Sequence, residues 1–407
     1  MRSFLRIAIR NVVRNRRRSL ITFSAVFLAL TIMVGIRGFM NGMQSGLRDS
    51  VVAGQLGALQ VHRKGFLQAM GSASLDFDLP TSDEFLQKVA SVQGVKAVTA
   101  RIHLGGMVNA HDTTTVALFT AIDPARESAV CPLRSEMIAA GSPLSPSSPS
   151  AANLSSALAS SLGLSLGEKA TLLTNDRDGV FSALELDYAG TFGQPGLPLP
   201  DKKMALVTLA FAQELLRMPG RATELAIAID DVERIESIRQ RVQAAVGNAY
   251  EVSTWHEMAP WLDESIAAQN FILSLLAGIF LFVALLGVVN TTLMSVYERT
   301  REIGTMMSVG VRRRQILILF LLEAALLGLS GGVLGATIGG AFVAFLNHRG
   351  VSIKMGDATA PMHFYPWIAP SYVLFILVIA TAGAVLAALW PSLRASRLRP
   401  VEALASL

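Results

Sequence analysis

The stretch FILSLLAGIFLFVALLGVVNTTLM, residues Phe271–Met294, decides the fold class of this chain. It holds no charged residue and exceeds the roughly 20 apolar residues that a bilayer-spanning helix needs. Lipid offers no hydrogen-bond partner to the backbone, so such a run has to be helical. Three further runs are long and predominantly apolar: Leu20–Met40, Ile316–Leu346 and Tyr372–Trp390. The sequence therefore predicts four transmembrane helices.

The amino-acid composition also indicates a protein that lies partly in lipid. The chain is 52% hydrophobic and only 16% charged, whereas soluble proteins carry about 25% charged residues. The net charge of +5 does not indicate nucleic-acid binding, because the arginines cluster beside the apolar runs. The single cysteine, Cys131, excludes an internal disulfide.

The positions of the arginines predict the orientation, because basic residues collect in cytoplasmic loops. Arg2, Arg6, Arg10, Arg14, Arg16, Arg17 and Arg18 precede the first run, Arg299, Arg301, Arg312, Arg313 and Arg314 lie between the second and third, and Arg394, Arg397 and Arg399 follow the fourth. We therefore expect both termini in the cytoplasm of an inner-membrane protein. A cleaved signal peptide is the alternative for the first run, but no small-x-small cleavage site follows it.

The predicted fold class is an α-helical membrane protein with four transmembrane helices and a large α+β extracytoplasmic domain inserted between helices 1 and 2. The expected segments are a cytoplasmic amphipathic basic helix (1–19), transmembrane helix 1 (20–42), the α+β domain (43–269, with a β-rich insertion at about 131–200), transmembrane helix 2 (270–296), a cytoplasmic coupling loop (297–314), transmembrane helix 3 (315–347), an outer loop (348–370), transmembrane helix 4 (371–391) and a cytoplasmic tail (392–407).

Within the inserted domain, short helical and strand patterns alternate, and two loops rich in Pro, Ser or Gly interrupt them at Gly141–Ser150 and Gln194–Pro200. The histidines His62, His103 and His111 lack the close paired spacing of a metal site. No G-x-S-x-G elbow is present either. The sequence thus gives no support to an enzyme, and we expect neither a metal nor a cofactor on this chain.

The loop SVYERTREIGTMMSVGVRRRQ, residues Ser295–Gln315, is longer than a simple connector needs to be. We expect it to leave the second span as a charged helix and to turn near Gly304 and Gly310. Its apolar residues Ile303, Met306, Met307 and Val309 are flanked by acids and arginines. This composition suits docking into a groove of a cytoplasmic partner, or equally a helix lying on the membrane surface.

Three separated motifs resemble the FtsX/MacB/LolC-E family of ABC-transporter permeases. The loop is similar to the family run E-R-x-x-E-I-G-x-x-x-A/S-x-G, the N-terminal A-x-R-N-x-x-R-N-R-R-R stretch ends at Arg18, and the tail from Pro391 to Leu404 resembles the usual family ending. In that family the loop docks onto the ATPase subunit. The resemblance therefore implies an ATPase-coupling role for Glu298, Arg299, Glu302, Ile303, Gly304, Met307 and Gly310.

The chain shows no Walker A motif, since the nearest approach, Gly163 to Lys169, lacks the adjacent Gly-Lys-Ser/Thr. The resemblance then implies that ATP and magnesium bind to a separate cytoplasmic ABC ATPase, unlike the MacB type, which carries its ATPase on the same chain. The other expected partners are the lipid membrane, a second permease subunit in a homo- or heterodimer, and a lipoprotein or periplasmic protein.

The sequence after the first span favours the lipoprotein-releasing LolC/LolE branch. Gly38-Phe-Met-Asn-Gly-Met-Gln44 looks like the M-N-G-F stretch of those permeases. Phe39, Met40 and Met43 are candidates for a substrate-entry site that accepts acyl chains. The alternative for these three residues is ordinary packing near the outer interface.

Small residues recur along the third span. Gly328, Gly332, Ala336 and Gly340 repeat every four residues, a spacing that lets helices approach closely. The sequence leaves open whether this row packs within one chain or against a second copy. Glu323 lies inside the same span, and we expect it to pair with an arginine of the loop, because an unpaired intramembrane acid is costly.

The function that follows is a non-catalytic permease subunit that extrudes lipoproteins or other amphipathic substrates by mechanotransmission. The alternative is an FtsX-like signalling scaffold that activates a cell-wall hydrolase without transport. An outer segment of the predicted size argues modestly against the scaffold, which usually has a shorter outer domain.

Overall fold

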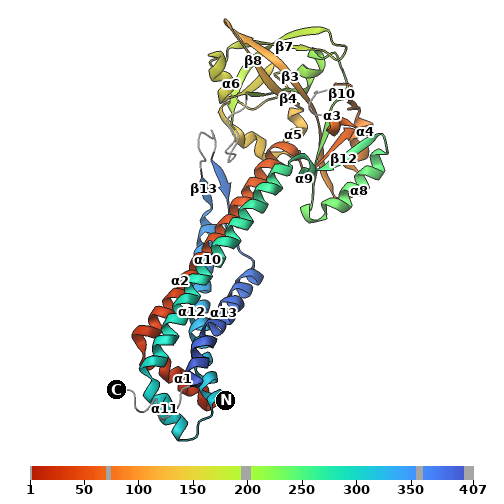
Figure 1. The fold of residues 1–407 in the computed structure, drawn as a ribbon. Helices are drawn as coiled ribbons and strands as arrows, with labels where there is room; N and C mark the ends of the chain where they lie inside the picture. The colour runs from red at the N-terminus through yellow and green to blue at the C-terminus, as the bar shows by residue number, and fades with distance from the viewer. Residues whose placement is uncertain (1, 70–74, 194–202, 354–360, 398–407) are drawn as a thin grey trace. The chain divides into compact units, whose positions relative to one another are not determined.

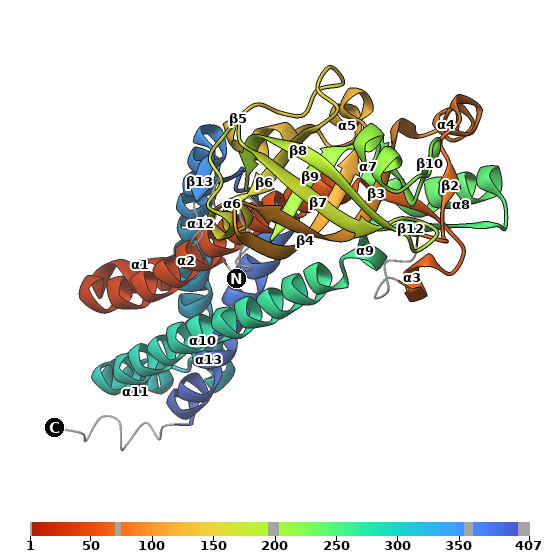
Figure 2. The same ribbon diagram turned by 90° about the horizontal axis from the view of Figure 1, so that it is seen from above.

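The computed structural model describes residues 2–69, 75–193, 203–353 and 361–397 (Figures 1 and 2). The chain divides into two compact units. We call residues Met1–Gln44, Ile266–Val351 and Phe364–Leu407 the helical unit, and residues Ser45–Ser265 with Ser352–His363 the inserted domain. The predicted loop Gln194–Pro200 and the end of the predicted tail motif lie outside the described residues.

Four helices are long and apolar enough to cross a membrane, which confirms the predicted number. These four helices and two shorter ones form the helical unit. The bounds are α1 (Arg2–Arg14), α2 (Arg16–Val51), α10 (Pro260–Glu298), α11 (Thr300–Ser308), α12 (Arg313–Arg349) and α13 (Pro370–Ser396).

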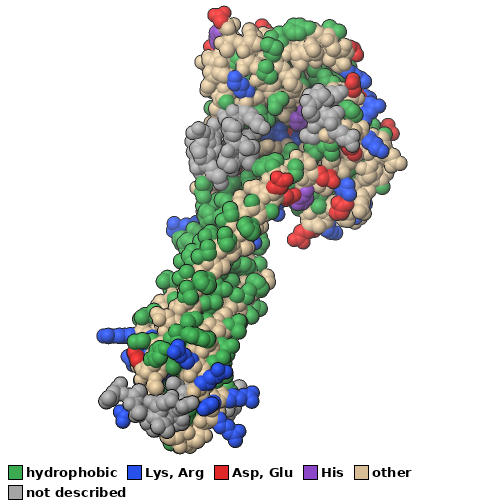
Figure 3. Space-filling model, in the orientation of Figure 1, with side chains coloured by type: hydrophobic (Ala, Val, Ile, Leu, Met, Phe, Trp, Pro, Cys, Tyr) green, Lys and Arg blue, Asp and Glu red, His purple; other side chains and the backbone are tan. Residues whose placement is uncertain are grey.

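The long helices extend past the hydrophobic runs on which they were predicted. The 39 residues of α10 correspond to about 58 Å of helix at about 1.5 Å per residue, against a hydrocarbon core of about 30 Å. Along its apolar part Phe271, Leu275, Phe282 and Leu286 are exposed. In Figure 3 hydrophobic side chains cover the middle of the helical unit, and Lys and Arg gather at the end that carries α1 and α11. This distribution is that of a multi-pass membrane protein.

Glycine residues of α12 allow neighbouring helices to pack closely against it. A Cβ added at Gly335 would lie 2.5 Å from the carbonyl oxygen of Phe27, and one at Gly331 would lie 2.9 Å from that of Phe23. This row of α12 therefore touches the backbone of α2. On the adjacent face a Cβ at Gly328 would lie 2.9 Å from the Cβ of Ala384 in α13. Small residues thus let α12 approach two helices of its own chain at once.

The inserted domain is built on one mixed sheet of ten strands within the described residues. Its core is apolar and includes Leu59, Ile102, Phe119, Leu154 and Leu225, all almost fully buried. The strands are β1 (Leu59–Arg63), β3 (Val95–Ala110), β4 (Thr113–Ile122), β5 (Ile138–Gly141), β6 (Ala151–Ser155), β7 (Lys169–Asn175), β8 (Phe181–Phe192), β9 (Met204–Thr208), β11 (Glu224–Ile229) and β12 (Tyr250–Thr254).

The strand order is β12-β1-β11-β3-β4-β9-β6-β8-β5, and β7 bridges β3 and β8. The pairs β4–β9 and β6–β8 are parallel, and the remaining pairs are antiparallel. The stretch predicted as a β-rich insertion, 131–200, supplies β5 to β8. Its strands β6 and β7 pair with β9 and β3 from outside the stretch, so it is continuous with the main sheet.

Helices and short strands complete the domain. Helix α6 begins at Ser156, because the residues before it form the buried strand β6. The α-helices are α3 (Phe66–Ala69), α4 (Asp83–Ala90), α5 (Pro124–Val130), α6 (Ser156–Leu162), α7 (Leu209–Leu215), α8 (Ile235–Val246) and α9 (Trp255–Met258). The π-helix η1 (Val52–Leu56) and the 3-10 helices η3 (Pro132–Met137) and η4 (Val232–Arg234) are further helical segments. The short strands are β2 (Leu79–Pro80), β10 (Arg221–Ala222), β13 (Val351–Ile353) and β14 (Met362–Phe364).

The first and last strands of the domain's sheet are neighbours. Strand β1 follows α2 and η1 along the chain, and β12 precedes α9 and α10. The two strands pair antiparallel, with Leu59 opposite Thr254 and Arg63 opposite Tyr250. The chain therefore enters and leaves the domain at the same end of one strand pair.

Candidate functional site

The predicted coupling segment, expected to begin as a charged helix, contains one helix that runs through Gly304. Helix α11 spans Thr300–Ser308. The prediction of a turn near Gly304 is wrong, because Gly304 is buried inside this helix, where its missing side chain permits close packing. The predicted turn near Gly310 is confirmed. Gly310 has φ +99°, a left-handed conformation that favours glycine.

Most apolar side chains of α11 point into the helical unit. Ile303 has no exposed surface and packs in a cluster with Val296, Ile316, Phe320 and Ala395. Met306 and Met307 pack against the same cluster. The sequence interpretation of these residues as one docking patch is therefore corrected for Ile303, which anchors the helix. Val309 is different, since 81% of its surface is exposed.

Arg299 is the centre of an ionic network at the start of α11. Its Nε lies 3.1 Å from Oε2 of Glu302, and its Nη1 donates to Oε1 of Glu323 at 3.2 Å. Arg299 is only 6% exposed, and its guanidinium also lies over the ring of Phe320. The prediction that Glu323 pairs with an arginine of the loop is confirmed. The pair joins α11 to α12.

Helices α1 and α2 contribute to the same network. Asn11 of α1 donates to Oε1 of Glu323 at 2.7 Å, and Arg14 of α1 contacts Glu302 at 2.7 Å. Arg18 of α2 pairs with Glu298, the last residue of α10. Acids predicted to serve an external partner are thus bound to basic or amide side chains of this chain.

The environment of Glu302 lowers its pKa. Burial opposes the ionised carboxylate, but hydrogen bonds from Arg14 and Arg299 outweigh that cost and bring the pKa below its ordinary value. Glu302 is therefore a carboxylate at neutral pH. Because Arg14 and Glu302 are about half exposed, that outer pair contributes little stability compared with the buried Arg299 pair.

The substrate-entry candidates lie at the other end of the first span, where they are partly buried. The ring of Phe39 packs edge-on against Phe364, with centroids 5.3 Å apart. Nearby, the backbone N–H of Trp367 donates to the carbonyl oxygen of Gly38 at 3.1 Å. Met40 and Met43 are half-buried. This end of α2 is therefore fastened to the segment before α13, and the entry role of the three residues stays a prediction.

The helix-packing row on α12 is divided in the structure. Gly328 packs against Ala384, Gly332 meets Leu377 of α13, and Ala336 is buried. A Cβ at Gly340 would meet nothing within 4 Å. The first three residues thus support packing within one chain, and Gly340 does not take part in it.

Sequence reasoning missed a buried ionic cluster in the inserted domain. Arg101 of β3 is 1% exposed, and it binds Glu127 of α5 at 2.7 Å and Glu224 of β11 at 3.1 Å. Its Nη2 also donates to Sγ of Cys131 at 3.0 Å. An arginine within the alternating pattern of a strand was the only available signal.

Charge pairing fixes the ionisation of this cluster. Burial alone raises the pKa of Glu224, but the charge and hydrogen bond of His103, together with Arg101, bring it down to about 2. His62 is buried between the backbone oxygen of Thr223 and the side chain of Gln60, and burial lowers its pKa. Both observations fit the expectation that these histidines are structural. Among the described residues, no group of three His, Cys, Asp or Glu side chains could hold a metal ion.

Four apolar helices, with an α+β domain inserted between the first and the second, define a multi-pass membrane protein. Residues 274–400, which include α11, α12 and α13, match the family model of the FtsX-like permease C-terminal domain. This part of the chain is therefore an FtsX-like permease domain.

Similar curated proteins include the macrolide export ATP-binding/permease protein MacB of Azoarcus sp. (strain BH72), which is 33% identical over 208 residues, covering 49% of this chain and 30% of that protein. The uncharacterized ABC transporter permease YknZ of Bacillus subtilis (strain 168) is 31% identical over 188 residues, covering 45% of this chain and 44% of that protein. The alignments thus span less than half the length of these relatives.

Two solved structures resemble part of the chain at a distance. The extracellular domain of YknZ from Gram-positive bacteria has a TM-score of 0.36 and 14% identity, covering 48% of this chain and 99% of that one. The periplasmic region of MacB from Actinobacillus actinomycetemcomitans has a TM-score of 0.36 and 7% identity, covering 51% and 94%. Scores this low carry no argument about function.

Proposed function

We propose that this chain is the permease subunit of an ABC transporter, driven by an ATPase on a separate polypeptide. The observation that carries the proposal is the fixation of α11 by Arg299, which bridges Glu302 and Glu323. A helix held in this way transmits a push to α12. The contacts of Arg14 and Arg18 extend the same connection to α1 and α2.

The proposed orientation places α1, α11 and both termini in the cytoplasm of an inner-membrane protein. The arginines at that end of the helical unit support it, because basic residues are retained on the cytoplasmic side. The inserted domain then lies outside the cytoplasm. A second permease subunit, identical or different, would complete the assembly, as one four-helix chain offers little around which to enclose a path.

The surface proposed to meet the ATPase is the outer side of α11 and the turn after it. Val309 is exposed there between Ser308 and Gly310, which are exposed as well. An exposed apolar side chain rimmed by polar groups is typical of an interaction site. In this proposal Ile303 and Gly304 support the surface from beneath and do not contact the partner.

The proposed substrates are amphipathic molecules, with lipoproteins as the particular case suggested by the sequence after the first span. In the second candidate function, a signalling scaffold, the same α11 connection would activate a cell-wall hydrolase. The two differ in one measurable respect. A transporter's ATPase responds to its substrate, whereas a scaffold's output is hydrolase activity.

Site-directed cross-linking tests the ATPase contact. The one native cysteine, Cys131, is buried, so a Val309→Cys variant places a reactive thiol on α11's outer turn. We expect it to cross-link to the partner ABC ATPase when the two are co-expressed. Val180→Cys, at a 48% exposed position of the inserted domain, is the matched control and should not cross-link.

A second measurement separates contact from coupling. Glu302→Lys reverses the charge that Arg14 and Arg299 bind, and we expect it to lower the permease-stimulated ATPase rate. Failure of the ATPase to associate in nanodiscs, or cross-linking from position 180 and not from 309, contradicts the proposal.

A further inference from the structure

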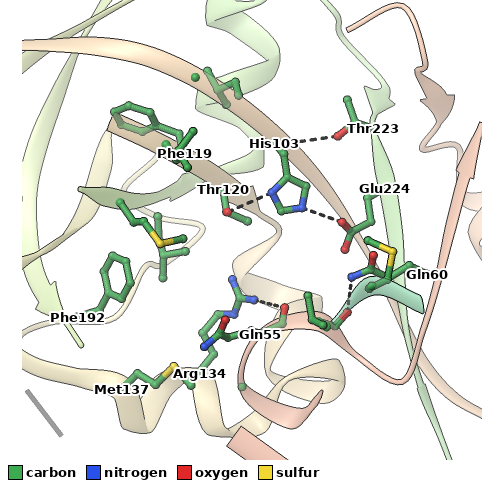
Figure 4. Close-up of a pocket in the computed structure, with 18 of the residues that line it drawn as sticks. Gln55, Gln60, His103, Phe119, Thr120, Arg134, Met137, Phe192, Thr223 and Glu224 are labelled. Atoms are coloured by element: carbon green, nitrogen blue, oxygen red, sulfur yellow. Dashed lines mark hydrogen bonds and ion pairs between the residues drawn. The ribbon is translucent and has the colours of Figure 1, made fainter. Parts of the chain in front are cut away.

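The inserted domain contains a cavity of about 390 Å³ that the proposed function does not use. It lies among β1, β3, β4, β9 and η1, with Met137 of η3 and Met258 of α9 also in its wall (Figure 4). Cavities of this size fall within the range of small-molecule sites in proteins. All of its lining residues belong to the inserted domain.

Most of the cavity wall is apolar. Phe119 and Phe192 lie on one side of it in Figure 4, and Met137 lies below them. Leu118 and Met204 add further apolar surface, and Leu118 is 54% exposed. An apolar wall of this extent gains free energy when an apolar ligand replaces water.

The opposite side is polar, and its acceptors already have partners. Glu224 accepts from Arg101 and His103. The Nδ1 of His103 meets the hydroxyl of Thr120 at 3.3 Å. Gln60 donates to the carbonyl oxygen of Leu56 and pairs through its Oε1 with His62. These groups leave no carboxylate free to receive a cationic ligand.

Two nitrogen donors in the same wall are less well satisfied. The Nε2 of Gln55 and the Nε of Arg134 are buried without a hydrogen bond. Arg134 Nη2 donates to the carbonyl oxygen of Gln55 at 2.6 Å. Its Nε lies 3.1 Å from Oε1 of Glu127, an ion pair without hydrogen-bond geometry. The Glu127 carboxylate thus partly satisfies the Nε of Arg134, whereas a buried donor without a hydrogen bond is destabilising, so an acceptor brought to the Nε2 of Gln55 would be favoured.

The electrostatics of Arg134 indicate that the acceptor is an anion. Burial and the neighbouring charge of Arg101 lower the pKa of Arg134, and Glu127 only partly offsets them. A second negative group would favour the charged guanidinium, and carboxylate is, with phosphate, one of the anions that arginine binds with a matching geometry.

We propose that this cavity binds a medium-chain carboxylate, with its alkyl chain among Phe119, Phe192 and Met137 and its head group at Arg134 and Gln55. At roughly 30 Å³ for each non-hydrogen atom the cavity holds about a dozen such atoms, which corresponds to decanoate. This site is separate from the ATPase contact and does not depend on it.

Photolabelling of the full-length chain in nanodiscs tests the site. The probe is decanoic acid carrying a diazirine on its chain, and labelled residues are located by mass spectrometry. We expect label on the cavity lining, and we expect decanoate to compete at least tenfold better than decanol, because the alcohol lacks the anion. Label restricted to the membrane helices overturns the proposal, as does equal competition by decanol.

Two sets of variants check the position of the ligand. Gly105 lines the cavity, and a Cβ there meets nothing within 4 Å, so Gly105→Phe fills space without a clash. It should abolish labelling of the cavity lining, and Leu118→Trp should act in the same way if the first variant does not fold. Val116→Phe places the same bulk at an exposed neighbouring position outside the cavity, and it should label like the wild-type chain.

The head-group assignment has its own variant. Gln55→Leu removes the side-chain donor, while the Gln55 carbonyl that accepts from Arg101 and Arg134 remains. We expect about a tenfold loss of decanoate competition and no change for decanol. An unchanged preference for decanoate refutes the role of Gln55, and unchanged labelling in the folded Gly105→Phe and Leu118→Trp variants refutes the site itself.

Discussion

Replacing Arg299 tests the network that fastens α11 to the membrane helices. An Arg299→Met variant keeps an apolar stem against Phe320 but removes the charge between Glu302 and Glu323. The side chain of Glu323 is only 13% exposed. In this variant it keeps the hydrogen bond from Asn11 but loses its arginine partner. Removing one member of a buried pair costs about 3–5 kcal/mol. We expect about 3 kcal/mol here, because Asn11 still contacts the carboxylate.

A double-mutant cycle isolates the pair from the general effect of truncation. Glu323→Gln removes the stranded charge, so the double variant Arg299→Met/Glu323→Gln should recover about 2 kcal/mol relative to Arg299→Met. Arg301→Met is the matched control, since Arg301 is exposed two residues further along the chain, and it should change the free energy of unfolding by less than about 0.5 kcal/mol.

The assay is reversible unfolding in bicelles, with each variant titrated by SDS and monitored by tryptophan fluorescence. Additive effects in the cycle, or equal losses in Arg299→Met and Arg301→Met, would refute the argument. Either result would mean that Arg299 and Glu323 do not stabilise each other and that α11 is held by the Ile303 cluster alone.

Three other perturbations have defined outcomes. Gly335→Val brings a side chain against the carbonyl oxygen of Phe27 and should cost about 1–3 kcal/mol of unfolding free energy, while Gly340→Val, where there is open space, should be nearly neutral in the same titration. Because the pKa of Glu224 is about 2 against an ordinary 4.5, its stabilisation is complete above pH 4.5 and is lost as the pH falls from 4.5 toward 2. Urea titrations across this window should show a loss of about 3 kcal/mol that Glu224→Gln removes, and an unchanged pH profile in that variant would contradict the assignment. Phe39→Ala should lower the unfolding free energy by about 1–3 kcal/mol through the lost ring contact, and full stability with lost transport would instead favour a substrate-entry role.

The membrane-spanning helices could be predicted from the sequence because their cause is local. A run such as Phe271–Met294 has one stable conformation in lipid whatever surrounds it. The same reasoning applies to β3 and β4, whose long alternating or β-branched segments need no distant information. It does not reach β12, whose five residues pair with β1 from the far end of the domain sequence.

The network around Arg299 could be predicted only in part. The cost of an intramembrane acid was enough to predict an arginine partner for Glu323. The direction in which Ile303 points could not be read from the sequence, because an amphipathic helix can turn its apolar side to its own chain or to a partner. The cavity and the Arg101 cluster depend on contacts among residues far apart in sequence, which no local pattern records.

The pairing of β1 with β12 has a mechanical consequence. Because Leu59 lies opposite Thr254, a load arriving along α2 and a load arriving along α10 both reach the domain at one end of the same ladder. If the two helices are displaced together, the ladder carries no load and the domain travels with them as one piece. If they are pulled apart, the hydrogen bonds open one after another from that end, which is the weakest direction in which to load a strand pair. In the proposed function, movement of both helices in step would leave this strand pair intact, whereas movement that separated them would open it from that end.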